Sequence, residues 1–169
     1  MNDLKERLQQ LEDLEEIRRL KHYYYSYCID RTLSGEKSAI EETISRFTDD
    51  IVADFTGFPL AEGREQVVDF YVRDVPLIIS YSQHYVFNEV IDITGDSAKG
   101  LWYLHCPVMF TEASPLGRET PGLIAGRYEE EYVKEDGVWK WRRIVALLDV
   151  MGPTEELWNG AKLLRSNKR

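Results

Sequence analysis

Hydrophobic positions repeat every three or four residues along the first part of the chain. Leucines and isoleucines follow this spacing from residue 4 to residue 20, with charged residues between them. The spacing predicts a long N-terminal helix over residues 3–30, whose last turns carry a cluster of tyrosines. Two shorter helices are predicted after it. One begins at Ser38 and carries Ile40, Ile44 and Phe47, and the other opens at Gly63 and is limited by Pro76.

Apolar and polar residues alternate along the second half of the chain, as is typical of β-strands. A short strand is predicted over Ile51–Phe55, and longer runs cover about 81–93, 98–111, 122–134 and 138–151, with turn signals between them. The tail from Thr154 to Arg169 is predicted to form a last short helix. Helices followed by an antiparallel meander predict an α+β fold in one domain, 1–169. We expect a cone-shaped, strongly curved, mostly antiparallel sheet, closed by the N-terminal helices around an apolar pocket.

Alternation along the strands sorts side chains by face, because residues two apart point the same way. In the run 98–111, the more apolar set is predicted to face inward, and it includes Trp102 and Cys106. His105 then falls on the outer face. In the run 122–134, Tyr128 and Glu130 share a face opposite three charged residues. We therefore expect Glu130 inside or at the rim, with Arg143 as its partner.

Charge and cysteine content narrow the classes of function. The 169 residues include 21 Lys and Arg against 30 Asp and Glu, a net charge of -9. An acidic surface disfavours a nucleic-acid partner, which needs a basic stripe. Two cysteines are too few for a disulfide scaffold and suit a reducing compartment, and no run approaches the length of a membrane span. With a charged N-terminus unlike a signal peptide, we expect a cytoplasmic protein without membrane or nucleic-acid partners.

His84 and Asp30 form the sharpest chemical hypothesis. A carboxylate that binds one imidazole nitrogen fixes the tautomer and leaves the other nitrogen as a base. The alternative is a partly exposed strand histidine and an aspartate that merely closes a helix. A metal site built from the three histidines of the chain lacks ligand-like spacing. We therefore predict no metal.

Several short segments, in this order, resemble the SnoaL-like proteins of the nuclear-transport-factor-2-like (cystatin-like) superfamily. The resemblance covers about Leu14 to Val145. Within the superfamily, the sequence resembles scytalone dehydratase and bile-acid 7α-dehydratase. It rests on these segments: Leu14–Lys21 followed by tyrosines and Asp30, Gly63–Glu65, Gln83-His84 with Asn88, Gly95–Gly100, Gly126–Glu130 and Asp136–Trp139.

The resemblance implies catalytic residues. The aspartate that ends the first helix falls on Asp30, a tyrosine five residues before it on Tyr25, and the strand histidine on His84. His84 would be the base, Asp30 its orienting partner and Tyr25 a hydrogen-bond donor. The position of a catalytic acid in the bile-acid enzyme falls on the neutral Cys106. Predicted substrate-binding residues are Asn88, Trp102, Cys106 and Tyr128.

The resemblance also implies the kind of reaction. We expect a cofactor-free lyase (dehydratase) or isomerase acting on a hydrophobic cyclic or polyketide-like small molecule. We also expect a homo-oligomer, a dimer or a trimer, because one face of a curved sheet needs cover. Two alternatives stay open: a non-catalytic binding or interaction module on the same fold, like a dioxygenase β subunit, and a metal-assisted hydrolase.

Overall fold

The N-terminal helix continues without interruption and changes type along its length. A computed structural model describes residues 2–156 of the chain, so the predicted tail beyond Glu156 lies outside the described residues. The helix consists of α1 (Asn2–Arg19), the π-helical segment η1 (Leu20–Tyr27) and α2 (Cys28–Leu33). A π-helix repeats its hydrogen bonds every five residues instead of every four. Side chains five residues apart within η1, such as the buried Leu20 and Tyr25, are therefore brought toward the same side.

The shorter helices differ in two places from the sequence expectation. The predicted second helix is short, formed by η2 (Lys37–Ala39) and α3 (Ile40–Ile44), and Phe47 already belongs to the first strand. The third consists of α4 (Arg64–Asp69), η3 (Phe70–Asp74) and α5 (Val75–Ile78). Pro76 does not stop it. It lies in the first turn of α5, directly after η3, and the helix ends two residues later at Ile78.

The strands form one seven-stranded sheet in the order β2-β1-β7-β6-β5-β3, and β4 also pairs with β5. Only β1 and β7 run parallel; the other paired strands are antiparallel. The 3-10 turn η4 (Thr154–Glu156) follows the last strand. The strands are β1 (Phe47–Phe55), β2 (Ala61–Glu62), β3 (Ile79–Ser82), β4 (Tyr85–Thr94), β5 (Ser97–Phe110), β6 (Thr120–Glu135) and β7 (Val138–Pro153).

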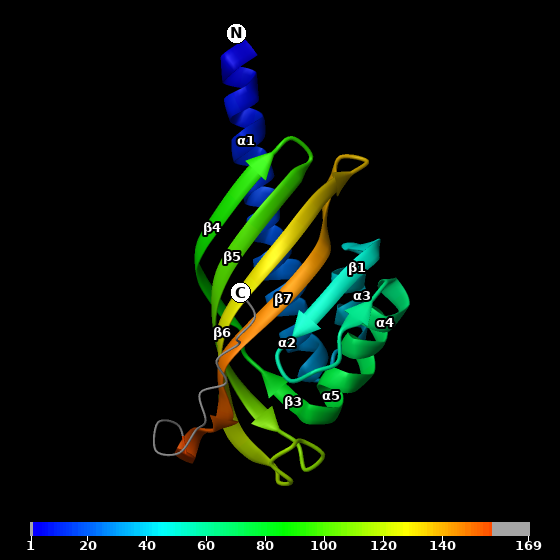
Figure 1. The fold of residues 1–169 in the computed structure, drawn as a ribbon, viewed down its shortest axis with the longest axis vertical. Coiled ribbons are helices and arrows are strands. Elements are labelled where there is room, and N and C mark those ends of the chain that lie inside the picture. Colours follow the sequence, from blue (N-terminus) through cyan, green and yellow to red (C-terminus); the bar gives the residue numbers. More distant parts are fainter. Residues whose placement is uncertain (1, 157–169) are drawn as a thin grey trace.

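The α+β prediction of a curved, mostly antiparallel sheet closed by helices is confirmed. In Figure 1 the N-terminal helix crosses one face of the sheet behind β4 to β7, and its first turns extend beyond the strand ends. Helices α3, α4 and α5 lie together near β1. Apolar side chains of the helices and of the inner sheet face form the hydrophobic core, which contains three fully buried tryptophans, Trp102, Trp139 and Trp141.

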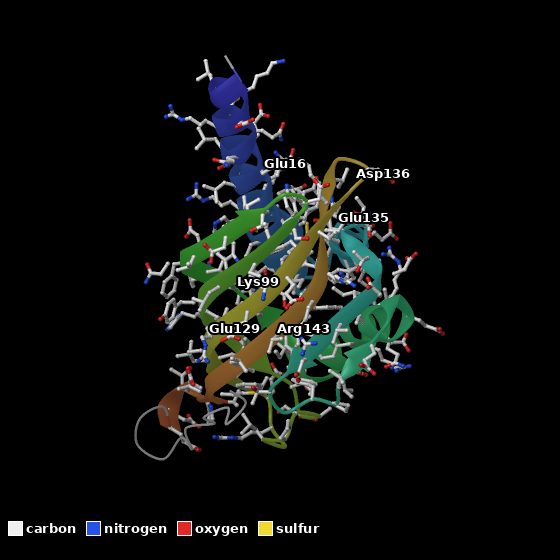
Figure 2. The ribbon with its side chains drawn as sticks, turned by 45° about the horizontal axis from the view of Figure 1, so that its top comes forward. Glu16, Lys99, Glu129, Glu135, Asp136 and Arg143 are labelled. Carbon is white, nitrogen blue, oxygen red and sulfur yellow. The ribbon has the colours of Figure 1, made fainter. Side chains whose placement is uncertain are left out.

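The predicted inward face of β5 is also confirmed. Trp102, Leu104, Cys106, Val108 and Phe110 are at most 4% exposed. The residues between them, including His105, are half-buried or exposed. Figure 2 shows charged side chains from three neighbouring strands, Lys99, Glu129 and Arg143, on the outer face of the sheet.

The predicted run 81–93 is interrupted in the middle. β3 ends at Ser82 and β4 begins at Tyr85, although both pair with β5 in the same register, Ser82 opposite Val108 and Tyr85 opposite His105. At the break, the backbone N–H of Gln83 donates to the Pro107 oxygen, but Pro107 has no N–H to return. The N–H of His84 points away from β5 and donates to the Asp30 carboxylate. Continuing the register across the break places His84 opposite Cys106, on the inner face of the sheet.

A substitution at Gly126 tests how closely β6 packs against β7. A Cβ atom there would lie 2.2 Å from the backbone oxygen of Leu147, next to an irregularity in the pairing of the two strands. We expect Gly126→Ala to lower the free energy of unfolding by about 1–3 kcal/mol, the range for overpacking. Urea denaturation measures it. Gly152→Ala is the matched control, because a Cβ there meets no atom within 4 Å; equal losses in the two variants would contradict this account.

Candidate active site

Asp30 and His84 meet where the helix end reaches the break between β3 and β4. His84 Nδ1 lies 2.6 Å from Asp30 Oδ1, and the His84 backbone N–H donates to Oδ2 at 2.8 Å. The Ser82 hydroxyl donates to Oδ1 at 2.6 Å. Three hydrogen bonds therefore hold the carboxylate, and the carboxylate in turn fixes the imidazole so that Nε2 is the free nitrogen.

The His84 imidazole binds a proton more tightly than an ordinary histidine. Burial of the ring lowers the pKa of His84, but the sulfur of Cys106 and the Asp30 carboxylate outweigh it and raise that pKa to about 9. The imidazole is therefore mostly protonated at neutral pH. Its neutral form, the base, is a minor species there but a stronger base than free imidazole.

His84 lines a small cavity enclosed between the helices and the inner face of the sheet. The cavity has a volume of about 60 Å³ and a mostly apolar wall. Its polar wall residues are Tyr25, Tyr71, Ser82, His84, Cys106 and Tyr128. An empty cavity of about 150 Å³ is enough to bind benzene. A ring compound therefore fits only if half-buried wall side chains such as Phe58 and Met151 move aside.

Tyrosine hydroxyl groups gather on one side of this cavity. The Tyr71 hydroxyl donates to that of Tyr25 at 3.0 Å, and the Tyr25 ring lies edge-on to the rings of Tyr128 and His84. Burial is the main cause that raises the pKa of Tyr25, Tyr71 and Tyr128. The phenols therefore stay protonated and keep their capacity to donate a hydrogen bond.

Behind these tyrosines lies a buried ion pair. The Lys21 Nζ is 2.5 Å from Glu130 Oε1, and both side chains are 0% exposed. The ammonium also lies 3.8 Å from the Tyr25 ring centroid and 3.3 Å from that of Tyr128, which are cation–π contacts. The Trp141 indole donates to the other carboxylate oxygen at 3.0 Å, and the Tyr132 hydroxyl donates to it as well. Burial lowers the pKa of Lys21 to about 8, against the opposing effect of Glu130.

The partner expected for Glu130 is therefore wrong. Arg143 points to the outer face, and its Nη2 lies 3.8 Å from Asp54 Oδ2. Lys21 of η1 takes its place, because its side chain reaches Glu130 on β6. The sequence offers no signal for this role, since Lys21 stands in a helix rich in exposed lysines, arginines and glutamates.

Two predicted substrate-binding residues lie away from the cavity. Asn88 is exposed, with a φ of 53° at an irregularity in the pairing of β4 with β5, so its side chain does not follow the strand alternation. Trp102 does face inward but is fully buried, and it donates to the Tyr132 hydroxyl at 2.9 Å. It fills the core next to the His22 ring and is not part of the cavity wall.

The other predicted site residues lie together. Tyr25, His84, Cys106 and Tyr128 all line the cavity, and Asp30 binds His84 from behind. Within residues 2–156, no three His, Cys, Asp or Glu side chains are grouped as a metal site requires. None of the helices described in this range is long and apolar enough to cross a membrane.

Comparison with known families assigns the chain. The model of the SnoaL-like domain matches residues 9–145, most of the sequence. The chain belongs to the SnoaL-like family.

Solved structures show the same fold. A hexachlorocyclohexane dehydrochlorinase of type 3 from Novosphingobium barchaimii is 22% identical with a TM-score of 0.72, covering 86% of this SnoaL-like chain and 92% of its own. A presumed scytalone dehydratase from Novosphingobium aromaticivorans is 22% identical with a TM-score of 0.68, covering 88% of each chain. An NTF2-like protein with a cystatin-like fold, from the same species, is 22% identical with a TM-score of 0.62, covering 94% and 96%. At this identity the likeness extends to the fold alone.

The pKa of His84 tests the charge balance of the site. We expect a value of about 9 in the native protein and lower values in Asp30→Asn and Cys106→Ala, because each substitution removes a group that stabilises the imidazolium. Titration of the His84 ring signals by NMR measures it. A His84 pKa that stays the same in both variants would refute this assignment.

The same shift predicts how stability depends on pH. A folded-state pKa of about 9 against 6.5 in the unfolded chain means that the folded protein holds the proton more tightly. The stabilisation from this group is complete below about pH 6.5 and is lost as the pH rises through about 9. Comparing the unfolding free energy of the native protein with that of His84→Gln across this range should show the difference shrinking as the pH rises.

The Lys21–Glu130 pair makes a second stability prediction. Lys21→Met should lower the free energy of unfolding by roughly 3–5 kcal/mol, because it leaves a buried carboxylate without a counterion. Adding Glu130→Gln should restore a large part of the loss, since the remaining polar group is neutral. A double-mutant cycle by denaturant unfolding measures both. A double variant less stable than Lys21→Met alone would contradict this account.

Proposed function

We propose that this SnoaL-like protein is a cofactor-free lyase, a dehydratase, or an isomerase acting on a small hydrophobic molecule with a carbonyl group. The observation that carries the proposal is the contact of His84 with Asp30 beside a mostly apolar cavity. A dehydratase- or dehydrochlorinase-type chemistry in structural relatives is consistent with it.

The geometry suits removal of a proton next to a carbonyl group. Nε2 of neutral His84 takes the proton from the carbon, and Asp30 stabilises the imidazolium that forms. The Tyr25 hydroxyl donates to the carbonyl oxygen, where negative charge develops. The imidazolium then returns its proton, either to a departing hydroxyl group, which completes a dehydration, or to a second carbon, which completes an isomerisation.

The cavity restricts the substrate. Its wall is mostly apolar and its free volume is small, so the proposal is for a compact ring or a short polyketide-like chain and not for a charged metabolite. Cys106 and Tyr128 are the proposed substrate-contacting residues, since both line the cavity beside His84. Asn88 and Trp102 drop out of this set.

A binding module without catalysis is the second candidate. One observation favours it: the raised pKa of His84 leaves little of the base form at neutral pH. Turnover that rises with pH toward about 9 would favour the enzyme, because the neutral imidazole is then more populated.

We also propose that the protein self-associates, as a dimer or a trimer, through the outer face of β4 and β5. Four large apolar side chains there are 43–58% exposed, namely Tyr85, Phe87, Val90 and Tyr103. Phe87 and Tyr103 stack on each other across the two strands. The two free cysteines suit the cytoplasm, which we propose as the location.

A substrate screen tests the proposed function. Hydroxylated and ketone-bearing ring compounds are incubated with the native protein, His84→Ala and Asp30→Asn, and products are followed by mass spectrometry. We expect turnover to fall by about 10²–10⁴-fold in His84→Ala, the usual contribution of a general acid–base group, and less in Asp30→Asn. His22→Ala is the control, because this exposed histidine does not line the cavity. Equal turnover by all four proteins would rule out the pair as catalysts.

A further inference from the structure

Cys106 lies directly across from His84 in the sheet. The pairing of β3 and β4 with β5 has one register on both sides of the break, and that register sets residue 84 against residue 106. The backbone confirms the close approach, since the N–H of Gln83 donates to the Pro107 oxygen at 3.0 Å. Side chains opposite each other in an antiparallel pair have Cβ atoms about 4.5–5.5 Å apart. The thiol and the imidazole both line the cavity, and Cys106 contributes to the raised pKa of His84. The thiol itself makes a long hydrogen bond to the Pro107 backbone oxygen, at 3.8 Å.

Asp30, His84 and Cys106 follow one another in the order that activates a nucleophile: a carboxylate, an imidazole and a thiol. Asp30 occupies Nδ1 of His84, so the nitrogen that remains for the thiol is Nε2. A thiol next to an imidazole whose other nitrogen is held by a carboxylate is the arrangement that activates cysteine in covalent catalysis. The Cys106 side chain is 2% exposed, so a reagent reaches the sulfur only by entering the cavity.

The second cysteine of the chain has none of these features. Cys28 lies on α2, is 0% exposed and does not line the cavity. Burial, together with the charge of Glu42, raises the pKa of Cys28 to about 11. A thiol held in its protonated form in this way is a poor nucleophile. Cys28 is therefore an internal reference for an unactivated buried thiol in the same molecule.

We propose that Cys106 is a nucleophile that forms a covalent adduct with α,β-unsaturated ketones and aldehydes small enough to enter the cavity. In this addition the thiol proton passes to His84 Nε2, and the sulfur forms a bond to the β carbon. The electron pair of the C=C bond moves toward the carbonyl group, and His84 then delivers the proton to the α carbon. No oxidant, reductant or leaving group is needed.

The adduct goes beyond the elimination proposed above and does not require it. Dehydration of a β-hydroxy ketone would produce the conjugated ketone beside the sulfur, but the same compound can also arrive from solution. The addition reverses by the same steps, with His84 taking the α proton. Cys106 would then hold a reactive carbonyl compound reversibly and block the cavity while it is bound.

The test measures labelling of single thiols. The native chain and the Cys28→Ala and Cys106→Ser variants are incubated with 2-cyclohexen-1-one, and the adduct is followed by intact-mass and peptide mass spectrometry. We expect one adduct, on Cys106, formed faster than on free cysteine in the same buffer, and none in Cys106→Ser. Cyclohexanone, which lacks the C=C bond, should give no adduct.

Activation by the imidazole is tested separately. In the Cys28→Ala background, His84→Gln should slow labelling of Cys106 by about 10²-fold or more, the lower end of general acid–base contributions, and Asp30→Asn should slow it less. Circular dichroism checks that the variants are folded. If His84→Gln does not fold, the comparison of Cys106 with free cysteine in the native protein still decides.

Three results would overturn the proposal: labelling of Cys106 no faster than free cysteine, labelling of Cys28 at the same rate as Cys106 in the native protein, or an unchanged rate in a folded His84→Gln variant. These outcomes are separate from the substrate screen. Labelling without any turnover would reject the proposed elimination and leave the nucleophile in place, and turnover without labelling would do the reverse.

Discussion

The carboxylate of Asp30 joins two parts of the chain that are more than fifty residues apart. It projects from α2, three residues before the helix ends at Leu33, and it accepts hydrogen bonds from the backbone N–H and the ring of His84 and from the Ser82 hydroxyl. Without it, the break between β3 and β4 would leave polar groups without partners in a partly buried place, which is costly. The same contact that joins helix to sheet therefore orients the imidazole toward the cavity.

A second polar centre lies deeper in the cone. Lys21 and Glu130 are fully buried, and a buried ion pair usually contributes little to stability compared with apolar residues. Here the ammonium contacts the faces of two tyrosine rings that form part of the cavity wall. The rings of Tyr25 and Tyr128 therefore lie between the Lys21 ammonium and the cavity. The side chains that hold them in place lie inside the cone.

Much of the fold and part of the site could be predicted from the sequence. The periodic patterns were sufficient for the α+β class, and the apolar alternation on β5 was sufficient to place Cys106 inward, because both depend on local spacing. The proximity of Asp30 to His84 followed from the family resemblance. Lys21 could not be predicted, since a buried lysine on a charged helix looks like a solvated one until its partner on β6 is placed. Asn88 was misjudged because its positive φ lies at a bulge, which has no signature in the sequence.

The π-helical segment η1 gives the length of the chain a role in the site. Each residue of an α-helix turns the following residues by about 100° around the axis. A turn of η1 holds more residues than an α-helical turn, so each residue from Leu20 to Tyr27 turns the chain by less than 100°. A one-residue insertion or deletion here changes the rotation between α1 and α2 unless the turn changes type and absorbs it. The number of residues between Lys21 and Asp30 is therefore part of what keeps the contact with Glu130 and the contact with His84 in place together.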